Sequence, residues 1–256
     1  MLEINKKTYM FNTKEIWFAD YPYDVEHCDG VTFMECKNRI DIAGFTRREF
    51  TTLVIDLMQD LDAVWKNMGK KSCRYEINRA KREGVIVKIN QNFNEFCEMD
   101  RSFREKKGLG TGSSCQPEFM RRYGTLFTAE VAGETIAGQF YLEDEKNVRW
   151  LVGASKRLEV DRDKAIVIGC ANRLMLWEAI KYAKEKGIKE FDFGGYYTGG
   201  DTNDPRYSIN LFKQSFGGEL TRHHIYQKDY SKLYRFARYL YKPIPPIISR
   251  IERLRW

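Results

Sequence analysis

Residues 125–154 read TLFTAEV-AGE-TIAGQFYL-EDEK-NVRWLVGA, and this stretch decides the fold. Runs rich in β-branched and aromatic residues, at 125–131, 135–142 and 147–154, are separated by short turns of small or charged residues. This spacing is typical of consecutive antiparallel strands. The stretch therefore predicts a three-stranded antiparallel meander.

The residues after the meander predict a helix followed by a strand. Residues 170–186 carry apolar side chains at helical spacing, Gly187 ends the helix, and residues 189–193 form a strand. A strand–helix–strand connection makes two strands parallel. We therefore predict a mixed, largely antiparallel sheet flanked by helices, an α/β (α+β) fold.

The predicted start of that helix is a candidate phosphate site. Gly169, Cys170 and Ala171 stand there, and free backbone N–H groups at a helix start favour an anion. An alternative interpretation makes Cys170 a nucleophile activated by the helix start.

The flanking sequence predicts further elements on both sides. Asp204 and Pro205 form a helix start, because aspartate caps the N-terminus and proline suits the first turn. The predicted strands are 51–57, 85–89 and 219–227, and the predicted helices are 61–84 (broken near Gly69), 92–107, 117–123, 205–215 and 230–241.

The composition excludes several classes of protein. The 256 residues are 43% hydrophobic and 31% charged, which is typical of a globular chain. No apolar run approaches the roughly 20 residues of a membrane-spanning helix. The N-terminus shows no apolar signal region, so we expect a cytoplasmic location. The chain has only three histidines, which argues against a zinc site, and no metal is predicted. The six cysteines form no Cys-x-x-Cys pair and are expected to be reduced thiols.

The net charge of +7 is concentrated in two basic segments. Residues 70–90 hold seven basic against two acidic side chains, and residues 219–256 hold nine against three. Such segments favour an anionic partner, either nucleic acid, a phosphorylated cofactor or an anionic membrane surface. The alternative for each segment is a solvated helix face.

Four short motifs occur in the order typical of one family. They are R-x-x-I-x-x-A-x-x-x-G-V at 74–85, W-E-A-I-x-x-A-x-x-x-G at 177–187, FDFGG at 191–195 and FK-x-x-FGG at 212–218. In these motifs the chain resembles the FemABX family, which builds peptidoglycan interpeptide bridges and lies within the GNAT acyltransferase superfamily. The resemblance covers about residues 51–227.

The resemblance implies acyl transfer to an amine, which forms an amide. Fem-type enzymes take the acyl group from aminoacyl-tRNA, whereas related GNAT members use acyl-CoA, and neither requires a tightly bound cofactor. The family's Phe-Lys pair near the reaction centre corresponds to Phe212 and Lys213. A fixed cation there would stabilise the oxyanion formed when an ester carbonyl is attacked. The alternative is that Lys213 is a solvated surface residue.

Other candidate site residues lie around the FDFGG motif. Asp192 would hold the acceptor amine or orient a water, or else would be a structural carboxylate bonded to nearby backbone N–H groups. The glycine-rich loop that follows is a candidate acceptor-binding segment, because loops at sheet ends carry specificity. The predicted substrate-binding residues are Trp150, Gly194, Gly195, Tyr196, Tyr197 and Asp201.

The chain departs from the related families in two ways. The pyrophosphate motif of CoA-dependent GNAT enzymes, Gln/Arg-x-x-Gly-x-Gly/Ala, is incomplete at Lys164–Ala171. The residues before 51 are too few for a second GNAT-like domain. We predict a small β-rich lobe at 1–50, the acyltransferase domain at 51–227, and a basic, aromatic helical extension at 228–256.

Three hypotheses about function follow. The first is an aminoacyl-tRNA-dependent N-acyltransferase, with tRNA as partner, acting on an amine of a cell-envelope peptide or amino sugar. The second is an acetyl- or acyl-CoA-dependent enzyme acting on a sugar or small-molecule amine. The third is a non-catalytic module that binds RNA or membrane. Residues 228–256 would contact the inner membrane surface, where lipid-linked precursors reside, or tRNA, or only the core.

Overall fold

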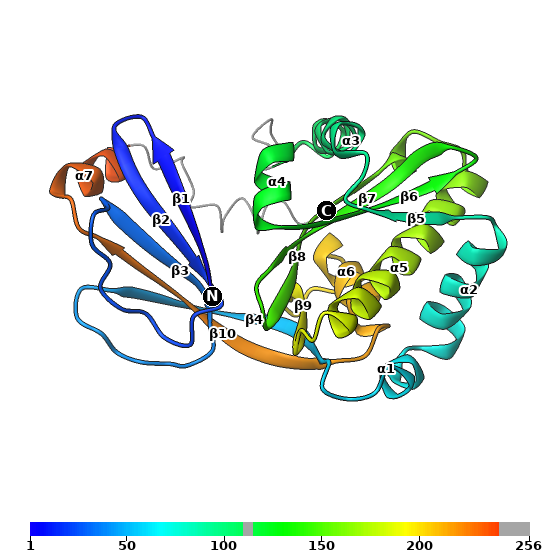
Figure 1. The fold of residues 1–256 in the computed structure, drawn as a ribbon, viewed down its shortest axis with the longest axis horizontal. Coiled ribbons are helices and arrows are strands. Elements are labelled where there is room, and N and C mark those ends of the chain that lie inside the picture. Colours follow the sequence, from blue (N-terminus) through cyan, green and yellow to red (C-terminus); the bar gives the residue numbers. More distant parts are fainter. Residues whose placement is uncertain (110–114, 241–256) are drawn as a thin grey trace. The chain divides into compact units, whose positions relative to one another are not determined.

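The computed structural model describes residues 1–109 and 115–240, which form two compact units (Figure 1). The first unit contains Met1–Thr52, Gly195–Thr198 and the described residues from Leu220 onward. The second contains Leu53–Gly194, apart from 110–114, and Gly199–Glu219. The predicted division at 1–50, 51–227 and 228–256 stays a prediction, and the end of its last part, residues 241–256, lies outside the described residues.

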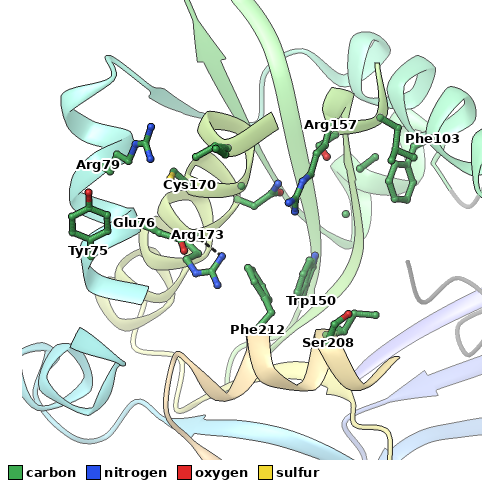
Figure 2. Close-up of a pocket in the computed structure, with 18 of the residues that line it drawn as sticks. Tyr75, Glu76, Arg79, Phe103, Trp150, Arg157, Cys170, Arg173, Ser208 and Phe212 are labelled. Carbon is green, nitrogen blue, oxygen red and sulfur yellow. Dashed lines mark ion pairs between the residues drawn. The ribbon is translucent and has the colours of Figure 1, made fainter. Parts of the chain in front are cut away.

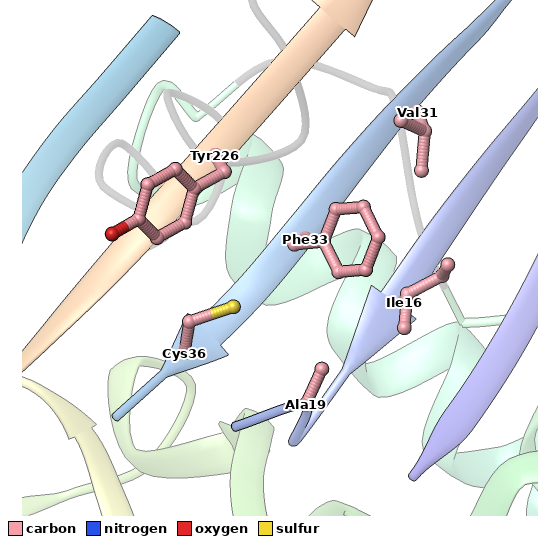
Figure 3. Close-up of a cluster of buried hydrophobic side chains, with 6 residues drawn as sticks. All are labelled: Ile16, Ala19, Val31, Phe33, Cys36 and Tyr226. Atoms are coloured by element: carbon pink, nitrogen blue, oxygen red, sulfur yellow. The ribbon is translucent and has the colours of Figure 1, made fainter. Parts of the chain in front are cut away.

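The first unit is built on strands β1 (Leu2–Thr8), β2 (Phe11–Trp17), β3 (Gly30–Cys36) and β10 (Glu219–Asp229), adjacent in that order. β1 and β2 form an antiparallel hairpin, β2 and β3 are parallel, and β3 and β10 are antiparallel. One face buries the cluster shown in Figure 3, to which Phe33 and Tyr226 contribute the large rings. Helix α7 (Lys232–Leu240) follows β10.

The second unit holds the predicted meander. β6 (Gly124–Val131), β7 (Glu134–Glu143) and β8 (Asn147–Ser155) are consecutive antiparallel strands. Ala132 and Gly133 join the first two with φ values of 50° and 83°, as a tight hairpin turn requires. β5 (Ile86–Ile89) pairs antiparallel with β6, and β9 (Glu190–Gly195) pairs parallel with β8. The predicted fold class is confirmed.

Helices flank this sheet near their predicted positions. Gly138 of β7 allows α3 (Phe93–Lys106) to pack closely, because a Cβ atom there would lie 2.3 Å from the Phe96 ring. The predicted cap of α6 (Pro205–Gln214) is confirmed, since the Asp204 side chain accepts the Arg206 N–H. The helices are α1 (Leu61–Asn67), the π-helical turn η1 (Lys70–Arg74), α2 (Tyr75–Arg82), α3 (Phe93–Lys106), α4 (Pro117–Tyr123), the 3-10 turn η2 (Lys156–Leu158), α5 (Arg162–Glu185) and α6 (Pro205–Gln214).

The start of α5 corrects a prediction. The helix begins at Arg162 rather than near Cys170, and the Asp161 side chain caps it by accepting the Lys164 N–H at 2.9 Å. Gly169, Cys170 and Ala171 therefore lie inside the helix, where backbone N–H groups bond to the preceding turn. The expectation that they offer free N–H groups at a helix start is wrong.

Two further observations complete the fold. Strand β4 (Thr46–Asp56) runs from the first unit into the second, passing the boundary after Thr52.

Within residues 1–109 and 115–240, none of the helices is both long enough and apolar enough to cross a membrane.

Candidate active site

The parallel strands β8 and β9 separate after a short ladder. They pair at Asn147↔Glu190, Val148↔Phe191 and Arg149↔Asp192, where their register ends. β8 continues to Ser155, paired on its other edge with β7. That ladder shifts register beside Trp150, so Leu151 is an extra, bulged residue. A bulge re-aims neighbouring groups, and an opening between diverging strands is a common ligand site in α/β folds.

A pocket of about 860 Å³ lies beside the stretch of β8 that no longer pairs with β9 (Figure 2). β8 contributes Trp150 and Gly153–Ser155 to its lining. The other walls come from η1, α2, η2, α5, α6, the C-terminal end of α3 and the residue that follows it. The whole pocket belongs to the second unit, so its shape follows from the packing of helices on one sheet.

The charge of the lining is strongly positive. Five basic residues line the pocket against one acidic residue, Glu76, which forms an ion pair with Arg173 at 2.9 Å. Concentrated positive charge in a concave site attracts an anionic ligand. We call the basic residues of the lining the cationic wall, and they are Lys71, Arg79, Lys107, Arg157 and Arg173.

The side of the pocket formed by β8 and α6 is aromatic. The rings of Trp150 and Phe212 lie 6.2 Å apart between centroids, and Figure 2 shows them next to one another. The Arg173 guanidinium stacks over Phe212 at 4.5 Å from the ring centroid, a cation–π geometry. The Trp150 indole N–H donates to the Val152 carbonyl, which fixes the ring. This side is suited to a flat or apolar part of a ligand, next to the cationic wall.

Two residues of α5 bring the helix backbone close to the pocket. A Cβ atom placed on Gly169 would have no atom within 4 Å, so the pocket extends to the helix backbone there. Cys170 also lines the pocket, but burial raises the pKa of its thiol. A raised pKa leaves little thiolate near neutral pH, which argues against the nucleophile interpretation.

Lys213 and Asp192 do not line this pocket but meet at Gly194. Lys213, only 3% exposed, donates from Nζ to the Gly194 carbonyl at 3.5 Å, a long contact. The Asp192 carboxylate accepts the Gly194 N–H. Arg149 completes this buried charged cluster, because a Cβ on Gly194 would lie 3.2 Å from its guanidinium. The structure therefore contradicts the solvated interpretation of Lys213, and Asp192 makes the backbone bond expected of a structural carboxylate.

The remaining predicted residues lie elsewhere. Gly195, Tyr196 and Tyr197 belong to the first unit. Asp201 is exposed and accepts the Asn203 N–H at 2.9 Å, which shapes the turn before α6. Ala171 is buried and lies outside the pocket lining. The pocket thus brings together four of the predicted residues, namely Trp150, Gly169, Cys170 and Phe212.

Sequence reasoning missed most of the cationic wall. Lys71 and Arg79 belong to the basic segment at 70–90, which was assigned no particular site. Arg157 and Arg173 carried no local signal, because only the course of the chain through β8 and α5 brings them to one pocket. Arg149 did carry one, since it is a charged residue between apolar neighbours in a buried strand.

Comparison with known proteins identifies related folds. Residues 69–207 match the family described as Acetyltransferase (GNAT) domain. The crystal structure of FemX is similar with a TM-score of 0.66 and 13% identity, over 91% of this chain and 85% of that one. L-PGS from Bacillus licheniformis is similar with a TM-score of 0.55 and 15% identity, over 84% and 73%. No curated protein matches the sequence. At these identities the structural likenesses concern the fold.

Proposed function

The chain belongs to the acetyltransferase (GNAT) domain family and is an acyltransferase, and from this premise we propose that its donor is aminoacyl-tRNA. The reaction would move the aminoacyl group to an amine of a cell-envelope peptide or amino sugar. The acceptor would be a small or lipid-linked molecule, and the use of tRNA would place the reaction in the cytoplasm.

The observation that carries the donor proposal is the source of the positive charge in the pocket. The Asp161 carboxylate accepts the Lys164 N–H at the N-terminus of α5, and residues 161–164 do not line the pocket. The positive charge comes instead from side chains on η1, η2, α2, α5 and the segment after α3. Side-chain cations around a groove are typical of proteins that follow a nucleic-acid backbone.

The aromatic side of the pocket supports the same donor. Trp150 and Phe212 would contact the terminal base, since stacking of a base on an aromatic side chain is a common mode of RNA recognition. The basic residues of the lining would then contact the phosphates of the short single-stranded end of the tRNA. A pocket of about 860 Å³ has room for such an end.

The chemistry proposed here joins the acceptor nitrogen to the ester carbonyl carbon. The amine attacks, a tetrahedral oxyanion forms, and the bond to the ribose oxygen breaks as a proton from the amine passes to that oxygen, which gives an amide and a free ribose hydroxyl. Lys213 would supply positive charge toward that oxyanion from the buried cluster around Gly194. Asp192 would hold Gly194 in place and position the FDFGG segment. Tyr196, Tyr197 and Asp201 remain the proposed acceptor contacts.

A second candidate donor is acetyl- or acyl-CoA, with a sugar or small-molecule amine as acceptor. The family description and the volume of the pocket favour it. The non-catalytic hypothesis is not carried further, because the family is one of acyltransferases.

A direct comparison of the two donors tests the proposal. Purified protein is heated with acetyl-CoA and with a longer acyl-CoA, since a ligand bound to the native state raises the midpoint of unfolding. Binding of bulk aminoacylated tRNA is measured at two salt concentrations, because phosphate contacts weaken steeply with salt. Salt-sensitive tRNA binding without a CoA shift supports the proposal. A shift with CoA esters and no tRNA binding replaces it with the second candidate.

A further inference from the structure

Two segments of the first unit expose large apolar side chains to solvent. Tyr9 and Met10, in the turn between β1 and β2, are 88% and 71% exposed. Helix α7 exposes four more residues, by 58 to 66%. We call these six residues the apolar tip, and they are Tyr9, Met10, Leu233, Phe236, Tyr239 and Leu240.

The two segments adjoin one another. Phe11, next to the β1–β2 turn, contacts Tyr234 of α7 with ring centroids 5.2 Å apart. Tyr234 also packs on Gly30, where a Cβ atom would lie 2.7 Å from its ring. Figure 1 shows α7 beside the end of the β1–β2 hairpin. The apolar tip is therefore one continuous region of one unit, although its segments are far apart in the sequence.

The helix is held by one face and leaves the other exposed. Tyr234 and Arg238 are one turn apart, and Arg238 forms an ion pair with Asp229 at 2.8 Å. Leu233, Phe236 and Leu240 follow the i, i+3, i+7 spacing of a different helix face. A helix anchored in this way presents its apolar residues in a fixed orientation. This arrangement differs from a collapsed core, because no described residue buries them.

Basic side chains border the apolar tip. Lys7, Lys232 and Arg235 are exposed there. The nearby carboxylates are engaged, since Asp229 pairs with Arg238 and Glu15 pairs with Lys6. A rim of cations around exposed apolar residues is the pattern of a helix that lies in a membrane interface with anionic lipids. We propose that the apolar tip docks this protein on an anionic phospholipid bilayer.

The composition of the tip distinguishes a bilayer from other occupants. Leu233, Leu240 and Met10 have no ring face for a nucleic-acid base, whereas an acyl-chain boundary accepts them. A second copy of the chain would bring two cationic rims together, which like-charge repulsion opposes. The inference extends the proposed function and does not depend on which acyl donor is used.

Vesicle binding by the full chain tests the docking. The protein is sedimented with vesicles of phosphatidylglycerol mixed with phosphatidylcholine, and with phosphatidylcholine alone. We expect binding to the anionic vesicles only, with weaker binding at high salt. The double variant Leu233→Ser/Phe236→Ser should weaken binding by about tenfold or more, because two inserted side chains are lost. Ile86→Ser, at a residue of the second unit that is 60% exposed, is the matched control and should leave binding unchanged.

A fluorescent variant locates the contact and separates the alternatives. Phe236→Trp should shift its emission to the blue with anionic vesicles and be quenched by brominated lipid. The tryptophan emission could also be blue without vesicles and stay unchanged when they are added. That result would mean that residues 241–256 or a second copy cover α7. That result, or binding of tRNA by the tip without vesicle binding, would overturn the proposal. Because the substituted residues are exposed, unchanged thermal unfolding is expected and would exclude misfolding as the cause.

Discussion

The Asp161 carboxylate accepts the backbone N–H of Lys164 at 2.9 Å, so the N-terminus of α5 is capped by the chain itself. The positive charge of the pocket lining comes from side chains on several elements. The proposed donor site therefore differs from a site that holds pyrophosphate on the backbone N–H groups of a helix. The basic side chains of the pocket lining are accordingly the first residues to test.

Removal of one wall cation should weaken donor binding. Arg157→Gln takes a charge out of the pocket lining, so we expect weaker tRNA binding. The slope of log affinity against log salt concentration should fall by about one, because one phosphate contact is lost. Arg162→Gln is the control, because Arg162 is exposed and lies outside the lining. The measurement is filter binding across a salt series. Equal losses in the two variants would mean that the wall has no special role.

Gly169 offers a pair of substitutions with opposite effects. Gly169→Ala should stabilise the protein by about 1 kcal/mol, because alanine is the better residue inside a helix and no atom lies within 4 Å of the new Cβ. Gly169→Leu should keep the fold but extend into the pocket and reduce donor binding. Thermal unfolding and donor binding measure the two effects. Undiminished donor binding by Gly169→Leu would place the donor elsewhere.

Lys213 should matter for catalysis more than for packing. Lys213→Met keeps an unbranched side chain in the buried position and removes the charge, so turnover should fall by about a hundredfold or more. Circular dichroism and donor binding serve as controls for the fold and the pocket. A folded Lys213→Met variant with normal turnover would contradict the role of the ammonium group.

The packing of α3 on the sheet should tolerate no side chain at Gly138. In Gly138→Ala the added Cβ would lie 2.3 Å from the Phe96 ring, so we expect a loss of about 1 to 3 kcal/mol from overpacking. Gly200→Ala, with nothing within 4 Å, should be close to neutral. Denaturant unfolding of both variants measures the difference. Equal stabilities would contradict the close packing.

Two cysteines should respond differently to pH. Burial raises the pKa of Cys170 above its ordinary value, whereas a hydrogen bond from Cys115 lowers the pKa of Cys97. Because only the thiolate reacts, iodoacetamide should label Cys97 at lower pH than Cys170, whose labelling should rise only as the pH passes the ordinary thiol pKa. Peptide mass spectrometry across a pH series reports each site. Rapid labelling of Cys170 near neutral pH would restore the nucleophile hypothesis.

The sequence predicted the parts of the fold that depend on local pattern. The meander at 125–154 and the Asp204–Pro205 helix start are specified by alternation, turns and capping residues, and the structure confirms them. The start of α5 was missed because Gly169 suggests a helix boundary, whereas a glycine inside a long helix is tolerated when the rest of the helix packs well. Asp161 carries the capping signal of the true start, and the prediction did not use it.

The site was harder to predict because it depends on where distant segments meet. Phe212 and Lys213 are neighbours in the sequence, yet one lines the pocket and the other lies in the buried cluster at Gly194, since adjacent helical residues point in different directions. The wall cations come from five separate segments. No spacing in the sequence relates them.

The central claim is transfer of an aminoacyl group from tRNA to an amine. The most direct measurement incubates the protein with tRNA charged with labelled amino acids and with an extract of cell-envelope precursors, and then treats the products with mild base. Base cleaves the ester to tRNA but leaves an amide intact. We predict a labelled, base-stable product with the wild-type protein and a strongly reduced yield with Lys213→Met. A base-stable product formed only from labelled acetyl-CoA would contradict the account.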